Sequence, residues 1–397
     1  MQYRTDLKSG NQLSIIGFGC MRFPKNLTQI DINKTEQLIL KAFREGVNYF
    51  DTAYAYGGSE DALGAILAKN NLRDKIFLAT KLPYQKCKTY EDFDSFFQIQ
   101  MKRLQTNYID YYLIHSLIDA NLWKKLCDLG IEKWIQEKKA SGQIKNIGFS
   151  FHGIHNDFLK LLDIYDWDFC QIQYNYIDVN YQAGVDGLKK AFAKGLPVII
   201  MEPLLGGKLA TGLPKKVVHT FKTANSSLTP AAWALRWLWN QKEVTVVLSG
   251  MSKMLDVEEN IIAAENAVPD MLTKEENDIY ESVIEMIRNT YKIPCTGCNY
   301  CMPCPQNVNI PACFSAYNTS YTIGRYDGLK QYVTSTGILH PSRNFSANNC
   351  IECGACEKKC PQHIPIIKSL KMVTKRMEPL WLRVALSMYM KLRSFHA

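Results

Sequence analysis

The residues Val47-Asn48-Tyr49-Phe50-Asp51, followed by an amphipathic stretch over 59–68, form one of eight similar units in the first ~270 residues. In each unit a short apolar run precedes a segment whose apolar residues recur with helical spacing. The apolar runs are 14–19, 47–51, 76–81, 108–115, 144–150, 169–173, 196–201 and 244–248. The helical patterns are 33–45, 59–68, 90–104, 122–140, 156–162, 182–193, 230–239 and 255–267. Eight alternating strand–helix units predict an α/β fold, a (β/α)₈ TIM barrel.

Polar residues stand at the ends of four of these expected strands. They are Asp51, Lys81, His115 and Ser150. The carboxyl ends of the strands of such a barrel open into one common mouth, where barrel enzymes work. We therefore expect four reactive side chains from four strands to converge there.

Eight of the thirteen cysteines form two runs near the C-terminus. The runs are Cys295, Cys298, Cys301, Cys304 before Pro305, and Cys350, Cys353, Cys356, Cys360 before Pro361. Three cysteines at successive C-x-x-C steps and a fourth before proline are the ligand pattern of a bacterial-type [4Fe–4S] ferredoxin, in which the Cys-Pro member ligates the other cluster. We expect one cluster on Cys295, Cys298, Cys301 and Cys360, and a second on Cys350, Cys353, Cys356 and Cys304.

Zinc and disulfides are the alternatives for these cysteines. Paired C-x-x-C units can hold tetrahedral zinc, but a third cysteine at the same step would then be idle in both runs. Disulfides are disfavoured because the sequence starts without a signal-peptide core. One departure is visible, since two residues precede Cys304 where the commonest spacing has three.

The expected order of domains is a barrel over 1–290, a smaller, mainly helical ferredoxin-like domain over 291–378, and a basic, apolar tail over 379–397. The tail pattern fits an interfacial helix on a membrane, or a terminal helix packed on protein, which we favour. No apolar run approaches the roughly 20 residues that span a bilayer. We expect a cytoplasmic protein.

The formal net charge of +9 does not indicate nucleic-acid binding. Each oxidised cluster with four thiolates carries about −2, which brings the loaded protein to about +5. Basic stripes with interleaved aromatic residues are lacking before the last few dozen residues.

The first ~270 residues resemble the aldo/keto reductase family. The matching segments, in the family's order, are Ile16-Gly17-Phe18-Gly19, Phe50-Asp51-Thr52-Ala53-Tyr54-Ala55-Tyr56-Gly57, Thr80-Lys81, Tyr112-Leu113-Ile114-His115, Gly148-Phe149-Ser150, Gln171-Ile172-Gln173-Tyr174-Asn175 and Glu259-Asn260. A ferredoxin-type tail on this barrel is similar to a subgroup of the family that carries a [4Fe–4S] module.

The resemblance implies a catalytic tetrad for carbonyl reduction, made of Asp51, Tyr56, Lys81 and His115. A free tyrosine with a pKa of about 10 is a reluctant proton donor, so we expect the ammonium of Lys81 to lower the pKa of Tyr56. Asp51 would hold Lys81, and a neutral His115 would orient the carbonyl. Taken singly, Asp51 could be a helix cap, Tyr56 a packing residue and His115 a core histidine.

The resemblance also implies a nicotinamide site. Its expected residues are Ser150 and Gln171 for the carboxamide, Met201 for stacking, Leu204 in the phosphate loop, Lys253, and Glu259 and Asn260 for the adenine. Members that prefer NADP place basic residues around 249–256, whereas here Lys253 is the one basic residue and Asp256 stands where arginine is frequent. The choice between NADP and NAD therefore stays open.

The two halves differ in how they move electrons. Nicotinamide transfers two electrons as hydride, whereas a [4Fe–4S] cluster passes one at a time. A flavin, or an external ferredoxin or flavodoxin, could link them, and the clusters could also be structural. We expect a redox-coupled enzyme acting on a small-molecule carbonyl. The alternative is an electron-transfer or regulatory subunit that binds nucleotide and a redox partner.

Overall fold

The computed structural model describes the chain except residues 296, 298–299, 340–343, 361, 380–381 and 383–397. Contacts divide the chain into two compact units. The first contains Met1–Thr211 and Phe221–Asn277, and the second contains Gly212–Thr220 and Asp278–Ala397. The two units have separate apolar cores.

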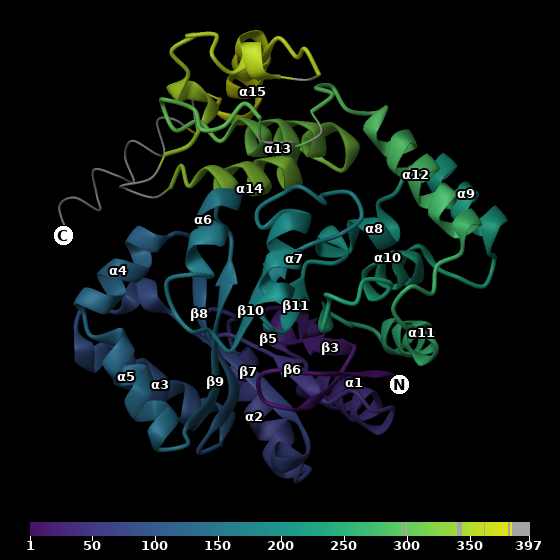
Figure 1. Ribbon diagram of the computed structural model, residues 1–397. Coiled ribbons are helices and arrows are strands. Elements are labelled where there is room, and N and C mark those ends of the chain that lie inside the picture. The colour runs from purple at the N-terminus through teal and green to yellow at the C-terminus, as the bar shows by residue number, and fades with distance from the viewer. Residues whose placement is uncertain (296, 298–299, 340–343, 361, 380–381, 383–397) are drawn as a thin grey trace. The chain divides into compact units, whose positions relative to one another are not determined.

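The first unit is a closed barrel of eight parallel strands (Figure 1), which confirms the predicted TIM barrel. The strands are β3 (Ile16–Gly19), β6 (Tyr49–Asp51), β7 (Phe77–Leu82), β8 (Ile109–Leu117), β9 (Ile144–Phe151), β10 (Phe169–Gln173), β11 (Val198–Met201) and β12 (Val246–Ser249). They pair in chain order, and β12 closes the barrel on β3 through Val247 opposite Ile16 and Ser249 opposite Phe18. Two small antiparallel hairpins lie outside the barrel: β1 (Tyr3–Thr5) with β2 (Gln12–Ser14), and β4 (Lys25–Asn26) with β5 (Gln29–Ile30).

Helices alternate with the strands. They are α1 (Ile32–Arg44), α2 (Ser59–Lys69), α3 (Tyr90–Leu104), α4 (Ala120–Asp128), α5 (Ile131–Ala140), α6 (His155–Leu161), α7 (Gly184–Ala193), α8 (Lys208–Thr211), α9 (Lys215–Ala224), α10 (Pro230–Trp239) and α11 (Met254–Glu265). The single helix expected over 122–140 is wrong. The chain forms α4 and α5 instead, because Gly130 adopts φ 89°, a left-handed conformation that ends one helix before the next begins.

Apolar side chains fill the barrel interior below its mouth. They are Leu13, Tyr49, Ala79, Tyr111, Leu113, Phe169, Ile199, Val246 and Leu248. Gly17 belongs to the same region, because a Cβ atom there would lie 2.8 Å from Leu248 Cδ2. The interior is therefore packed with apolar side chains.

The second unit is mainly helical. Its helices are most of α9, α12 (Lys274–Arg288), whose first turn belongs to the first unit, α13 (Ile310–Thr322), α14 (Arg325–Thr336) and α15 (Ile366–Met377). Phe314, Tyr332 and Val373 are among the residues of its core, and cysteines of both runs pack against that core. Across the described residues, every helix is too short or too polar to cross a membrane. Most of the tail expected over 379–397 lies outside the described residues.

Candidate active site

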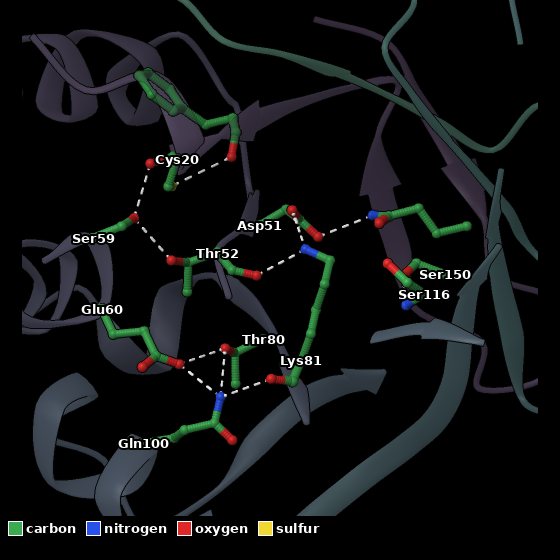
Figure 2. A network of polar contacts seen from close by, with 12 residues as sticks. Cys20, Asp51, Thr52, Ser59, Glu60, Thr80, Lys81, Gln100, Ser116 and Ser150 are labelled. Carbon is green, nitrogen blue, oxygen red and sulfur yellow. Dashed lines mark hydrogen bonds and ion pairs between the residues drawn. The ribbon is translucent and has the colours of Figure 1, made fainter. Parts of the chain in front are cut away.

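An ion pair between Lys81 and Asp51 lies at the mouth end of the barrel (Figure 2). Lys81 Nζ donates to Asp51 Oδ1 at 2.5 Å and to the Thr52 carbonyl oxygen at 2.8 Å. The side chains of Lys81 and Asp51 are 1% and 4% exposed. Burial alone would lower the pKa of Lys81, but the charges of Asp51 and Tyr56 raise it overall. The amine is therefore a buried ammonium held by a carboxylate.

Two residues expected at the nicotinamide lie next to this pair. Gln171 on β10 donates from Nε2 to Asp51 Oδ2 at 3.0 Å, so each oxygen of the Asp51 carboxylate accepts a hydrogen bond. Ser150 on β9 accepts from the backbone N–H of Ser116 at 2.8 Å. Both Gln171 and Ser150 are buried. These contacts fix two polar side chains beside the Lys81–Asp51 pair.

Tyr56 stands on the loop after β6, with Lys81 Nζ 5.0 Å from its ring centroid. Burial raises the pKa of Tyr56, and the charge and hydrogen bonding of Lys81 oppose this without reversing it. Lys81 therefore acts on the pKa of Tyr56 in the expected direction, but the overall pKa is raised, because desolvation of the phenolate outweighs the ammonium. The phenol stays protonated at neutral pH and has a proton to give.

His115 on β8 faces Tyr56. The two rings meet edge to face, with centroids 6.1 Å apart and planes at 87°. Burial lowers the pKa of His115 to about 3, helped by the charges of Lys81 and His152. The imidazole is therefore neutral near pH 7 and can hydrogen-bond a ligand without adding charge.

His152 and Glu202 belong to the same mouth, although neither was predicted as a site residue. The pKa of His152 is lowered overall by burial, while the charge of Glu202 and the hydrogen bond with Gln182 act to raise it and the charge of Lys81 acts to lower it. Gln182 Nε2 lies 3.4 Å from His152 Nδ1. His152 directly follows β9, so its position just past an expected strand end was the signal that could have found it.

A buried polar network contacts the backbone carbonyl of Lys81 (Figure 2). Gln100 Nε2, on α3, donates to Glu60 Oε1 at 2.7 Å, to Thr80 Oγ1 at 3.0 Å and to the Lys81 carbonyl oxygen at 3.1 Å. Thr80 Oγ1 donates to the same Glu60 oxygen at 2.7 Å, and the Tyr112 hydroxyl donates to Gln100 Oε1 at 2.6 Å. The network ties the strand that carries Lys81 to two helices, α2 and α3.

Arg103 extends this network toward the loop that carries Tyr56. Its Nη1 atom donates to Glu60 Oε2 at 3.2 Å, and its guanidinium lies 4.5 Å from the ring centroid of Tyr54. Tyr54 also meets Phe96 edge to face. Glu60 and Arg103 thus connect the Tyr56 loop with the strand of Lys81 through α3.

The other residues expected to hold the nicotinamide cofactor lie on β11, α11 and the adjoining loops. Met201 ends β11, Leu204 precedes a 3₁₀ turn over Leu205–Gly207, and Lys253 and Glu259 stand at the start and middle of α11. Asn260 Nδ2 donates to Ser249 Oγ at 3.0 Å.

Asp256 occupies the start of α11. Its Oδ2 atom accepts the backbone N–H groups of Ser252 at 3.1 Å and Lys253 at 3.0 Å. A carboxylate in the first turn of α11 therefore holds the backbone just before the helix and adds negative charge at the helix start, where a phosphate could otherwise bind.

A pocket in the second unit is lined by all four cysteines assigned to one cluster, Cys304, Cys350, Cys353 and Cys356, and also by Cys301. Of the other expected set, Cys295, Cys301 and Cys360 are half-buried against the core, and Cys298 lies outside the described residues. Thiolates around an apolar pocket fit the donor set of an iron–sulfur cluster. In the described part of the chain, no group of three or more His, Cys, Asp or Glu side chains is placed to hold a single metal ion.

Comparisons with known proteins match both units. The aldo/keto reductase family model matches residues 15–285, and a 4Fe–4S dicluster domain model matches residues 294–364.

Two curated relatives align with most of the barrel. An L-galactose dehydrogenase of Arabidopsis thaliana is 26% identical over 71% of this chain and 93% of its own. An NADP(+) aldo-keto reductase of Schizosaccharomyces pombe is 23% identical over 68% and 89%. The structure of an aldo-keto reductase from Bacillus halodurans in its holo form aligns with a TM-score of 0.57 at 25% identity, over 71% of this chain and 96% of that one.

Proposed function

The chain belongs to the aldo/keto reductase family and is an oxidoreductase with a 4Fe–4S domain, and we propose that it reduces the carbonyl group of a small aldehyde or ketone at Asp51, Tyr56, Lys81 and His115. The observation that carries this proposal is one mouth holding a protonated phenol, a neutral imidazole and a buried ammonium–carboxylate pair. Each of these groups has a separate task in reducing a carbonyl.

A nicotinamide cofactor, when bound, would supply hydride to the carbonyl carbon. Negative charge then develops on the carbonyl oxygen, and the Tyr56 hydroxyl donates the proton that completes the alcohol. The ammonium of Lys81 stabilises the phenolate that remains, and Asp51 keeps the ammonium charged and in place. His115 hydrogen-bonds the carbonyl oxygen as a neutral imidazole, which orients the substrate and leaves Tyr56 as the proton donor.

We assign cofactor binding to Ser150, Gln171, Met201, Leu204, Lys253, Glu259 and Asn260. Gln171 and Ser150 are buried polar groups beside the tetrad, as a carboxamide site requires. Asp256 at the start of α11 would repel the 2′-phosphate of NADPH, since like charges at a shared helix terminus disfavour each other. We therefore propose that NADH is preferred.

We propose two [4Fe–4S] clusters in the ferredoxin-like domain over 291–378, next to a catalytic domain over 1–290. The ligands are Cys295, Cys298, Cys301 and Cys360 for one cluster, and Cys304, Cys350, Cys353 and Cys356 for the other. Such clusters supply electrons singly. A bound flavin or an external one-electron carrier would reconcile these single electrons with hydride transfer at the barrel.

The test begins with anaerobic purification and analysis of iron, sulfide and flavin. Reduction of a panel of small aldehydes and ketones is then followed by NADH oxidation in the wild type, in Tyr56→Phe and in Tyr54→Phe. Tyr56→Phe should lose about 10²–10⁴-fold in kcat/KM, the contribution typical of a positioned acid. Tyr54→Phe keeps the ring that stacks on Arg103 and should stay within about threefold, because it removes no proton donor of the site.

Equal activity of Tyr56→Phe and wild type would refute the tetrad. Absence of carbonyl turnover with every donor, together with cluster oxidation that depends on a partner protein, would identify an electron-transfer subunit instead.

A further inference from the structure

Cys353 is the exposed member of the cluster ligands. Of the seven expected ligands that the structure describes, the other six are half-buried. Its neighbour Ile351 is 60% exposed, although it is a large apolar residue. A cluster held by Cys353 therefore has an edge near solvent, which a second redox protein can approach.

The segment that carries this exposed ligand is rich in exposed lysines. They are Lys358 and Lys359 on the loop after Cys356, and Lys368, Lys371 and Lys375 on the exposed side of α15. The three positions on α15 are spaced by three and four residues, which places them on one side of the helix. We call these five residues the lysine face.

The loop and the helix form one continuous surface. Lys371 Nζ lies 2.8 Å from Glu352 Oε2, and Glu357 Oε1 accepts the backbone N–H of Ile367 at 2.9 Å. Lys359 and Ile367 also line the pocket of the Cys350 run. The lysine face therefore borders the proposed cluster.

Few acidic groups offset the charge of these lysines. Residues 350–378 contain three acidic residues, Glu352, Glu357 and Glu378, and no aspartate. Glu378 is buried and accepts from the Tyr332 hydroxyl, and Glu357 is half-buried, which leaves Glu352 as the exposed acid in this segment. Five exposed lysines outweigh one exposed carboxylate and the charge of about −2 of the bordering oxidised cluster, so the surface stays positive.

We propose that the lysine face, together with the exposed Cys353 and Ile351 that line one pocket with Lys359, is the docking site of an acidic protein that carries one electron at a time, of the flavodoxin or ferredoxin kind. The inference rests on the two-cluster part of the proposed function. An apolar centre with a charged rim suits a transient protein interface, and opposite charge accelerates association. Met372, 40% exposed on α15, adds apolar surface beside Lys371.

The electron step is simple. One electron leaves the fully reduced flavin of a flavodoxin, which is thereby oxidised by one electron, and one oxidised [4Fe–4S] cluster is reduced by that electron. No bond forms or breaks, and no atom is transferred. The carrier is the reductant, so the step needs no other reactant.

The test uses full-length, anaerobically prepared protein and an acidic flavodoxin as the probe. Reduced flavodoxin is mixed with the oxidised protein in a stopped-flow instrument at several ionic strengths. The variant Lys358→Glu/Lys359→Glu/Lys371→Glu should lower the second-order rate constant at least tenfold at low salt, and should flatten its salt dependence. The control Lys124→Glu/Lys125→Glu/Lys133→Glu makes the same change of net charge on exposed barrel lysines, and should stay within about twofold.

Binding of oxidised flavodoxin, followed by its flavin fluorescence without electron transfer, should weaken in the face variant and not in the control. Iron content and circular dichroism check that each variant is loaded and folded. Equal losses in both triple variants would overturn the proposal, since net charge alone would then explain the rate.

Other results separate this proposal from the remainder of the function. Unchanged rates in the face variant, with clusters that dithionite reduces, would overturn docking at this face and leave the two clusters standing. Binding of anionic vesicles that is lost in the face variant, without any effect on flavodoxin, would assign the lysines to a lipid surface instead. Protein without iron would refute both proposals, whereas failure to reduce carbonyls would refute the tetrad alone.

Discussion

The Tyr56 and His115 rings contact each other edge to face, at a centroid distance of 6.1 Å. Both side chains are half-buried, and this desolvation is the chief reason that the phenol remains protonated and the imidazole remains neutral. The two groups therefore differ in role without differing in charge. Tyr56 can transfer a proton to the substrate oxygen, whereas the neutral His115 can only hydrogen-bond it.

Replacing His115 by glutamine should change how stability depends on pH. The pKa of His115 is about 3 in the folded protein, against about 6.5 in the unfolded chain. As the pH falls from 6.5 toward 3, the unfolded chain binds a proton that the folded protein excludes, so the wild type loses about 1.4 kcal/mol per pH unit from this group.

His115→Gln should lack this loss, measured by urea unfolding between pH 4 and 7. His219→Gln, at an exposed position of α9, is the matched control and should keep the wild-type slope. If the free energy of unfolding depends on pH in the same way in the wild type and in His115→Gln, the imidazole of His115 is not held neutral by the fold.

Gln100→Leu should destabilise the barrel and disturb Lys81. The change removes the donor to Glu60 and the acceptor of the Tyr112 hydroxyl, both buried, and each lost partner costs about 1–3 kcal/mol. Urea unfolding should report a loss of about 2–4 kcal/mol. Gln98→Leu, at an exposed position on the same helix, should change stability by less than about 0.5 kcal/mol.

Kinetics would separate positioning from bulk stability in the Gln100 variant. Under conditions where Gln100→Leu is fully folded, kcat should fall while the KM for the carbonyl changes little, because the ammonium acts mainly in the transition state. A variant with unaltered kcat would show that the network stabilises the fold without positioning Lys81.

Asp256→Arg should shift the protein toward NADPH. The carboxylate at the start of α11 is replaced by a cation, so the Kd for NADPH should fall about tenfold relative to the Kd for NADH, or about 1.4 kcal/mol. Quenching of protein fluorescence by each cofactor measures both constants. Glu258→Arg, exposed on the same helix, should leave the ratio unchanged. If the ratio of the two Kd values is the same in the wild type and in Asp256→Arg, the 2′-phosphate does not bind near residue 256.

Paired cysteine variants can test the crossed cluster ligation. Cys304→Ser/Cys350→Ser removes two ligands of one proposed cluster, so about four of about eight irons should remain. Cys360→Ser/Cys350→Ser removes one ligand from each cluster and should leave almost no iron. Iron analysis after anaerobic purification distinguishes these results, and Cys127→Ser is the control outside both runs. If the two double variants retain the same iron, the crossed assignment is wrong.

Periodicity predicted the barrel because each strand–helix unit carries its own local signals. The limits expected for α3 and α10 agree with those in the structure, where Thr89 with Asp92 and Thr229 with Pro230 mark the helix starts. The helices α8 and α9 were not expected, because the segment after β11 contains no long apolar period and its short helices depend on tertiary packing.

The sequence predicted those site residues that stand at the ends of the expected strands. Asp51 ends β6, and Lys81 and His115 lie one and two residues before the ends of β7 and β8, and the structure brings them together with Tyr56. The direction of the pKa shift of Tyr56 was not predictable, because it depends on how deeply the phenol is buried relative to its distance from Lys81. Gln100 was also missed, since a glutamine in an amphipathic helix is indistinguishable in sequence from an exposed one.

The pairing of β12 with β3 sets an order for biosynthesis. The first strand of the barrel has no partner on one edge until Val246–Ser249 has left the ribosome, so the catalytic half cannot close before then. Both cysteine runs emerge later still. The machinery that delivers iron and sulfide therefore meets a nascent chain whose barrel can already have closed. A defect in cluster supply should leave a folded barrel joined to a ferredoxin-like domain that lacks its clusters.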